Sequence, residues 1–217
     1  MRIPWQRHPH GDRTDTLPSA LPADRDQVVS AARTLYARHG FAQTSHREIA
    51  SRVGTTPEQV RALFATDADL FAAVYHQVQD EVGALVAAAY TGPDPLELMR
   101  AGLGAWIEAC HDPEVRRVLV LDPPTALGWE RWRREGDAYG RVLIDAVLAD
   151  AMDQGLIAEQ PVRPLSFVLA GALESGCQFA AHDPDPGTAL AQVRVSLESL
   201  LDGLVRTGQA VTTDTAP

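Results

Sequence analysis

The sequence predicts an all-α protein, built of a small N-terminal domain of three helices and a larger helical domain. Apolar residues recur three and four positions apart along most of the chain, which is the spacing of one face of an α-helix. Most of these runs begin after Asp, Ser or Thr, the residues that cap helix N-termini, and several have Pro at the first helical position. The 217 residues, 45% of them hydrophobic, suffice for one core and a smaller second one.

Two short helices with a tight turn between them are predicted for residues 44–64, TSHREIASRVGTTPEQVRALF. The first begins at a capping box, in which Ser45 and Glu48 satisfy each other's backbone N–H groups. It ends at Gly54, because a helix end favours a left-handed residue without a Cβ. Such a pair indicates a helix-turn-helix, whose second helix enters the major groove of DNA. Taken alone, this stretch also fits an ordinary helical hairpin.

Three residues mark the start of the second helix of the pair. Thr56 is its cap, Pro57 takes the first helical position, and Gln59 completes a second capping box. Before the pair, a further helix is predicted for residues 24–39, closed by Gly40. It gives the two short helices a surface to bury against, so that the three helices form a minimal DNA-reading domain.

Charge is divided unevenly along the chain. The net charge is −10, yet residues 1–66 carry nine arginines against six acidic residues, which gives +3, and the remainder carries −13. An acidic protein binds DNA where its basic residues gather on one face. The modest basic excess coincides with the predicted helix-turn-helix, although ordinary solvated helix faces would also account for it.

Further helices are expected after this domain. Their predicted ranges are 66–90, 94–110, 112–121, 125–154 and 162–182, followed by a last helix that carries the apolar residues between 190 and 204. We therefore divide the chain into a disordered arm, a DNA-binding domain, a ligand-binding and dimerisation domain, and a tail, at residues 1–23, 24–66, 67–206 and 207–217.

Residues 33–74 resemble the N-terminal domain of the TetR family of bacterial transcriptional repressors. The shared features are a first helix ending in Gly-Phe, a Thr-Ser start, the pairs Ile-Ala and Val-Gly, a short helix ending in Phe, and a Ser/Thr cap followed by Leu. The resemblance implies a homodimer, an all-helical ligand-binding domain, and repression that a small molecule relieves.

Two positions depart from the family's pattern. Family members often have Tyr in the recognition helix, where this chain has Arg61 and its neighbours, and Lys after the cap of the fourth helix, where it has Asp67. An Asp beside a DNA phosphate would repel it, and Arg61 is expected to supply the contact that is lost.

The expected DNA-binding residues lie at the starts of the two short helices. Helix N-termini suit phosphate, Gln59 could read adenine through two hydrogen bonds, and Arg61 could read guanine or hold a phosphate. The candidates are Thr44, Ser45, His46, Arg47, Thr55, Thr56, Pro57, Gln59 and Arg61. For each of them a purely local capping or solvated role is the alternative.

A dimer interface is expected on the last two helices. The helix at 162–182 is rich in small residues, which let another helix approach, and the last helix has a narrow apolar seam. Doubled by a two-fold axis, they would form a four-helix interface. The alternative for these residues is intrachain core, and the family resemblance favours the dimer. The candidates are Ala170, Leu173, Val193, Leu197, Leu200 and Leu204.

The effector is expected to bind between helices of the larger domain. Aromatic side chains predominate among the candidates, which predicts a hydrophobic and planar ligand, although such residues also serve as plain core. They are Trp106, Cys110, Trp129, Trp132, Tyr139, Phe167 and Glu174.

Catalytic and metal chemistry find little support. Glu108 and His111 match the Glu-x-x-His spacing of di-iron bundles, but such a site needs two of these motifs and further glutamates. Cys110 and Cys177 are expected to be buried thiols in a reducing cytosol. With no apolar leader segment and no 18-residue apolar run, we expect a cytoplasmic protein, without cofactor or metal, that is not an enzyme.

These observations predict a ligand-responsive regulator, which as a dimer places two recognition helices on a pseudo-palindromic operator and is released by a small hydrophobic effector. One alternative is a helical dimer of the same fold that binds a ligand or a protein partner without specific DNA binding. A weaker one is a metal-dependent helical enzyme.

Overall fold

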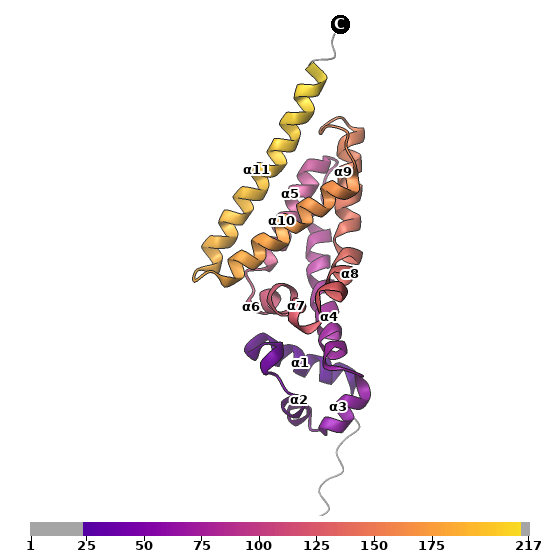
Figure 1. The fold of residues 1–217 in the computed structure, drawn as a ribbon, viewed down its shortest axis with the longest axis vertical. Helices are drawn as coiled ribbons and strands as arrows, with labels where there is room; N and C mark the ends of the chain where they lie inside the picture. Colours follow the sequence, from indigo (N-terminus) through magenta and orange to yellow (C-terminus); the bar gives the residue numbers. More distant parts are fainter. Residues whose placement is uncertain (1–23, 214–217) are drawn as a thin grey trace, which may run out of the picture.

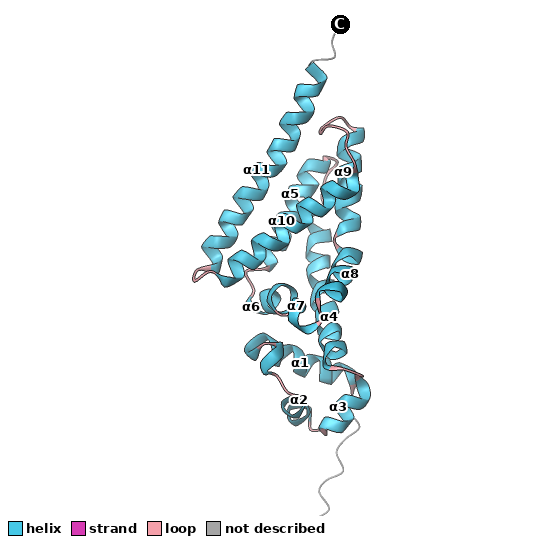
Figure 2. Cartoon of the chain, viewed as in Figure 1, coloured by secondary structure: helices cyan, strands magenta, loops and turns pink. Residues whose placement is uncertain are grey.

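The structure is a computed structural model that describes residues 24–213, apart from the side chains at 137–139 and 206–213. Every regular element in the described part is a helix, which confirms the predicted all-α class (Figure 2). The predicted N-terminal arm lies outside the described residues. The N-terminal helices are α1 (Arg25–His39), η1 (Phe41–Gln43), α2 (His46–Val53) and α3 (Pro57–Leu63).

The long helix α4 (Asp67–Ala89) leaves this small domain and runs up into the larger one (Figure 1). The elements after it are α5 (Pro95–Ala109), α6 (Pro113–Val115), the π-helix η2 (Arg116–Leu121), α7 (Pro123–Ala126), α8 (Trp129–Tyr139), α9 (Arg141–Asp153), α10 (Val162–His182) and α11 (Pro186–Thr213). The last of these continues into the segment for which a tail is predicted.

The single helix predicted for residues 125–154 is wrong. The chain is interrupted twice, first at Gly128, which has φ +76°, and then at Gly140 between α8 and α9. At the second break the flanking hydrogen bonds, from the N–H of Gly140 to the Gly136 carbonyl and from the N–H of Ile144 to the Gly140 carbonyl, are both long, at 3.4 Å. Glycine lowers helix stability, and here two such residues divide one apolar run into three helices.

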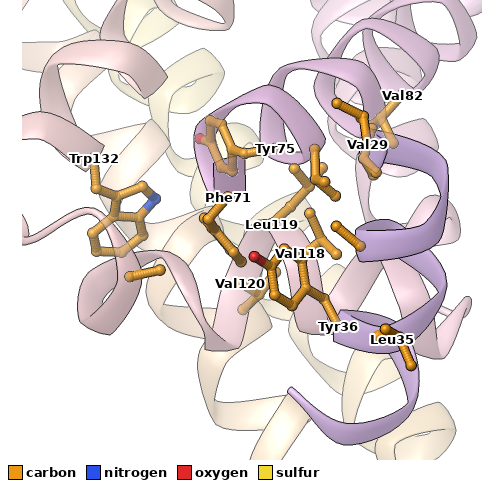
Figure 3. Packing of buried hydrophobic residues seen from close by; sticks show 14 of the residues in the cluster. Val29, Leu35, Tyr36, Phe71, Tyr75, Val82, Val118, Leu119, Val120 and Trp132 are labelled. Carbon is orange, nitrogen blue, oxygen red and sulfur yellow. The ribbon is translucent and has the colours of Figure 1, made fainter. Parts of the chain in front are cut away.

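One hydrophobic core joins the two domains. Tyr36 of α1 and Phe71 of α4 meet with ring centroids 5.4 Å apart, and Val118 and Val120 of η2 pack beside them (Figure 3). Phe71 is fully buried. The DNA-reading helices therefore rest on a surface that belongs partly to the larger domain. A second cluster, formed by α5, α9, α10 and α11, lies at the far end of the larger domain.

Helices α10 and α11 pack closely, as the small residues of α10 predict. A Cβ added at Gly176 would lie 2.6 Å from Cγ1 of Val193, so only glycine allows this approach. Val193, which meets Gly176 of α10, and Leu197 are both buried within the chain. These two residues therefore belong to the intrachain core, the alternative that the sequence left open.

Candidate functional site

The helix-turn-helix is fixed by its own side chains. Both predicted capping boxes are confirmed: the Ser45 hydroxyl accepts from the N–H of Glu48, and the Thr56 hydroxyl accepts from the N–H of Gln59, each at 3.3 Å. Gly54 between the helices has φ +72° and ψ +30°, the left-handed conformation expected there. Hydrogen bonds from Ser45 hold the pKa of the exposed Glu48 carboxyl below its usual value. The two helices thus begin and end where the sequence predicts.

Most predicted DNA-binding residues already have a local role. Thr44 donates its hydroxyl to the Gly40 carbonyl at 2.9 Å, and Ser45 and Thr56 are caps. Pro57 begins α3. These residues shape the backbone of the predicted reading face, and the hydroxyl oxygens of Thr44, Ser45 and Thr56 are engaged within it.

Gln59 is restricted in how it could read a base. Its Oε1 accepts hydrogen bonds from the Thr55 hydroxyl and from the N–H of Thr56. Reading adenine through two hydrogen bonds requires both the oxygen and the nitrogen of the amide. In the arrangement of the structure only the amide N–H2 group of Gln59 remains available, so the predicted two-bond reading would require both local bonds to break.

Three exposed arginines lie on the pair of helices, Arg47, Arg52 and Arg61, and the first and last of them are predicted DNA-binding residues. Arg47 is exposed on α2 and forms no ion pair with the residues that the structure describes. Arg61 lies 3.4 Å from Glu58 on α3, and both side chains are mostly exposed. Exposed pairs of this kind contribute little and open easily, so both guanidinium groups can reach a DNA backbone or base.

Asp67, the residue that departs from the family's pattern, lies beside His46. Its Oδ1 is 2.9 Å from Nε2 of His46, which joins the start of α2 to the start of α4. His46 is therefore a link between the reading helices and the helix that leaves the domain.

A cavity of about 200 Å³ lies in the larger domain. Its walls come from α4, α5, η2, α8, α9 and α10, and they are mostly apolar. Of the seven predicted ligand-binding residues, four line it: Trp106, Trp132, Phe167 and Glu174. Cys110 is fully buried in the core instead, Trp129 is 59% exposed, and the side chain of Tyr139 lies outside the described residues.

Sequence reasoning missed the contribution of α4 to this cavity. Tyr75 and Gln79 line it, one helical turn apart. Gln79 is only 4% exposed, and its Oε1 has no hydrogen-bond partner in the described part of the chain. A glutamine within the otherwise apolar stripe of α4 was the signal that could have revealed this wall. Arg133 and Arg141 also line the cavity, and neither is among the residues predicted from the sequence.

The π-helix η2 contacts both the cavity and the DNA-reading domain. Leu119 and Val120 line the cavity, and Asp122, two residues after Val120, accepts a hydrogen bond from the N–H of Phe41 at 2.7 Å. A single π-turn in a helical segment is frequent at functional sites. A shift of the cavity wall would therefore reach Phe41, at the start of η1 just after α1, through two residues of backbone and one hydrogen bond.

Two further links tie the domains together. Arg33 of α1 bonds Glu81 of α4 and Glu114 of α6, with nitrogen–oxygen distances of 2.6 Å in both ion pairs. Arg131 of α8 bonds Asp69 in the first turn of α4 at 3.0 Å. Because α8 also carries Trp132, a wall of the cavity is connected to the helix that follows the recognition helix.

The hydrogen bond between the N–H of Phe41 and Asp122 can be tested by substitution of Asp122. Replacing it with alanine leaves the Phe41 N–H without its charged acceptor, and we expect the free energy of unfolding to fall by about 1.5–3 kcal/mol. Asn at position 122 keeps an acceptor and should cost much less. Burial raises the pKa of the Asp122 carboxyl, despite the hydrogen bond from Phe41 and the charge of Arg117.

The raised pKa gives this prediction a pH dependence. The folded state holds the proton of Asp122 more readily than the unfolded state, so this group's contribution to stability declines as the pH rises from about 4. We therefore expect the wild type to lose stability relative to Asp122→Asn over that rise, in urea titrations at a series of pH values. Parallel pH profiles of the two proteins would show that Asp122 is not the group responsible.

The exposed apolar side chains of α10 and α11 indicate which face is open to a partner. Leu200 is 51% exposed, and Val168, Phe179 and Val195 are 59–65% exposed. Ala170, Leu173 and Leu204 pack partly against the cores of the chain. Among the six predicted interface residues, Leu200 is thus the most open to a second copy.

The remaining chemical groups are two thiols and one Glu–His pair. Cys110 and Cys177 are buried free thiols, the second of which lines the cavity, and Glu108 lies 4.0 Å from His111, with side chains that are 77% and 43% exposed. The described residues hold no cluster of three or more His, Cys, Asp or Glu side chains suited to a metal ion. Nor does any described helix combine the length and apolar character needed to cross a membrane.

A helix-turn-helix joined to a helical domain with an internal cavity defines a class, that of DNA-binding regulators which respond to a ligand. The family model "Bacterial regulatory proteins, tetR family" matches residues 28–74, and the model "Tetracyclin repressor-like, C-terminal domain" matches residues 96–204. The chain belongs to the TetR family of transcriptional regulators, whose members bind DNA operators as dimers. This membership confirms the predicted regulator and does not favour the alternative of a dimer without DNA binding.

Solved structures of the family resemble this one. A TetR-family transcriptional regulator from Pectobacterium atrosepticum is 25% identical, with 83% of this chain and 93% of that chain covered and a TM-score of 0.74. A TetR transcription regulator from Haloarcula marismortui is 19% identical, covers 83% of this chain and 97% of its own, and has a TM-score of 0.71. Comparison with curated proteins gave no match.

Proposed function

We propose that this regulator is a cytoplasmic, non-enzymatic repressor that a small apolar effector releases from its operator. The observation that carries this proposal is the position of η2, which forms part of the cavity wall and whose C-cap, Asp122, accepts the hydrogen bond from the N–H of Phe41. A ligand that changes the cavity can act on the reading helices only if it binds the two states with different affinity. The π-helix and α8 supply the contacts through which such a difference would act.

For the DNA contacts, we propose that Arg47 and Arg61 provide the charge and that the capped starts of α2 and α3 position them. Thr44, Ser45, His46, Thr55, Thr56, Pro57 and Gln59 then support the face, chiefly through their local hydrogen bonds and backbone N–H groups. Two copies related by a two-fold axis would place two such faces on successive major grooves of a pseudo-palindromic site. The exposed side chains of α10 and α11, Leu200 among them, are proposed to form the interface.

For the effector, we propose that the cavity is its binding site. Trp106, Trp132, Phe167 and Glu174 remain the candidates from the sequence that line it, and Tyr75, Gln79, Arg133 and Arg141 join them. The lining is apolar with a few polar groups, as in sites for small molecules generally.

Gel-shift titration of the DNA next to this protein's own gene, across a salt series, tests the function. We expect specific binding at physiological salt, with an affinity that falls as salt rises, because phosphate contacts release counterions. A well-folded dimer that binds this DNA no better than a scrambled sequence of equal length would count against the proposal. It would direct the search to the alternative in which the fold binds ligands or protein partners alone.

A further inference from the structure

We propose that the cavity selects an organic anion: a mostly apolar, ring-containing molecule with one acidic group held by Arg133 and one hydrogen-bond donor directed at Gln79. This inference rests on the proposed function of the cavity as the effector site, and it adds the chemical class of the effector. The apolar requirement comes from the walls, where Trp106, Trp132 and Phe167 present rings to the interior.

The acidic group follows from the two arginines in the cavity wall. Arg133 and Arg141 both lie over the ring of Phe167, with their guanidinium carbons 5.7 Å and 3.5 Å from its centroid. Two guanidinium groups on one ring repel each other, and burial together with Arg133 lowers the pKa of Arg141. Glu174 is the one carboxylate among the lining residues, so that the lining carries two positive charges against one negative.

Arg133 is the cation that is most available to a ligand. It is half-buried, it lies against the aromatic faces of Trp129 and Phe167, and it forms no ion pair with any described residue. Arg141, by contrast, also has Asp145 close enough to raise its pKa. A planar guanidinium stacked on aromatic rings keeps its N–H groups free at the edge, where a carboxylate binds through two parallel hydrogen bonds.

The negative charge of Glu174 does not remove the preference of the cavity for an acidic ligand. Burial raises the pKa of its carboxyl, although Arg133 and Arg141 act in the opposite direction. The structure places it in no ion pair with a described residue. It therefore leaves the guanidinium of Arg133 without a paired carboxylate, so that this cation can bind an acidic group of a ligand.

The donor requirement comes from Gln79. Its side chain is almost completely buried, and Oε1 lacks a partner within the described part of the chain. Buried polar atoms are nearly always hydrogen-bonded, and an exception at the wall of a cavity marks a group that a ligand can satisfy. A hydroxyl or ring N–H of the effector would donate to this oxygen.

Two dyes that differ by one charged group test the proposal. The probes are 8-anilinonaphthalene-1-sulfonate, an apolar anion with one N–H donor, and N-phenyl-1-naphthylamine, which has the same rings and the same N–H but no charge. Both are titrated into the full-length protein, and their fluorescence gives dissociation constants. We expect Arg133→Gln to weaken binding of the sulfonate about tenfold, the loss of one charge-assisted contact, and to change binding of the neutral dye by less than about twofold.

Two further variants locate the dyes. Arg134→Gln removes a neighbouring, exposed arginine of α8 that does not line the cavity, and it should change neither constant. Gly83→Leu fills the wall of α4, where an added Cβ would meet no atom within 4 Å, and it should weaken both dyes. Sulfonate binding that survives Gly83→Leu would place the dye elsewhere and overturn the proposal.

A competition in the wild-type protein makes the test independent of the folding of any variant. 2-Naphthoate should displace the bound sulfonate at a concentration at least about tenfold lower than its neutral isostere 2-naphthamide or the cation 2-naphthylmethylammonium. Equal potency of acid and amide, preference for the cation, equal weakening of both dyes by Arg133→Gln, or no dye binding at all would each overturn the anion assignment. In those cases, specific operator binding in the gel shift would still support the proposed regulator. Anion binding without operator binding would instead support the anion site and contradict the proposed regulator.

Discussion

Replacing Arg47 with alanine is expected to weaken operator binding at least about 30-fold. Arg47 is exposed on α2 and unpaired among the described residues, so its guanidinium is available to DNA without breaking another bond. A good base contact contributes about 1–3 kcal/mol. Because a two-fold dimer carries the substitution twice, even the lower figure gives about 2 kcal/mol per dimer, and each 1.4 kcal/mol is tenfold in affinity.

The salt dependence of the same variant tells what Arg47 touches. If it contacts phosphates, the slope of log affinity against log salt should decrease by about two, one for each copy, and all DNA sequences should lose affinity alike. If it reads a base, discrimination at one operator position should relax and the slope should change little. Either result can be read from gel shifts at four or five salt concentrations.

Arg134→Ala is the matched control for this experiment. Arg134 is also an exposed helical arginine, but it lies on α8 of the larger domain. Alanine is the best helix former, and Arg47 is exposed and forms no hydrogen bond or ion pair with a described side chain, so neither change should affect folding. Equal operator affinity of the wild type and Arg47→Ala would remove Arg47 from the proposed DNA-binding face.

The DNA-reading helices could be predicted closely because their ends are determined locally. A capping box needs only Ser45 and Glu48, or Thr56 and Gln59, three positions apart, and no distant residue takes part. One consequence of these local hydrogen bonds could not be predicted from the sequence. An oxygen that serves as a cap partner, such as Oε1 of Gln59, is no longer available for base reading, and this is visible only when both hydrogen bonds are seen together.

The larger domain could be predicted only in part, because periodicity shows which face of a helix is apolar and not what that face packs against. Trp129 and Trp132 fit the same aromatic pattern, yet Trp132 is buried at the cavity while Trp129 is exposed. Val193 and Leu200 share one apolar seam, yet the first is buried within the chain and the second is open. The path of the neighbouring helices decides between these outcomes, and it depends on breaks such as the one at Gly140.

Phe71→Ala is expected to lower the free energy of unfolding by about 3–5 kcal/mol, the largest loss that we predict for a single side chain. Phe71 is fully buried, and its ring lies 5.4 Å from that of Tyr36 and 5.3 Å from that of Phe41, centroid to centroid. The substitution removes apolar contact and leaves a cavity at the place where α1, η1, α4 and η2 meet (Figure 3). Urea unfolding at one fixed protein concentration measures the loss, since the stability of a dimer depends on concentration.

Leu85→Ala on the same helix provides the comparison, because Leu85 is 58% exposed and its truncation should cost less than about 0.5 kcal/mol.

The operator affinity of Phe71→Ala is a second informative measurement, because Phe71 lies where the two domains meet. If this shared core couples the domains, the variant should also lose operator affinity at temperatures where it is still folded, because the reading helices rest on the ring that has been removed. A large loss of stability with unchanged operator affinity would show that the core only stabilises the fold, and coupling would then have to pass through the hydrogen bond of Asp122 and the ion pairs of Arg33 and Arg131.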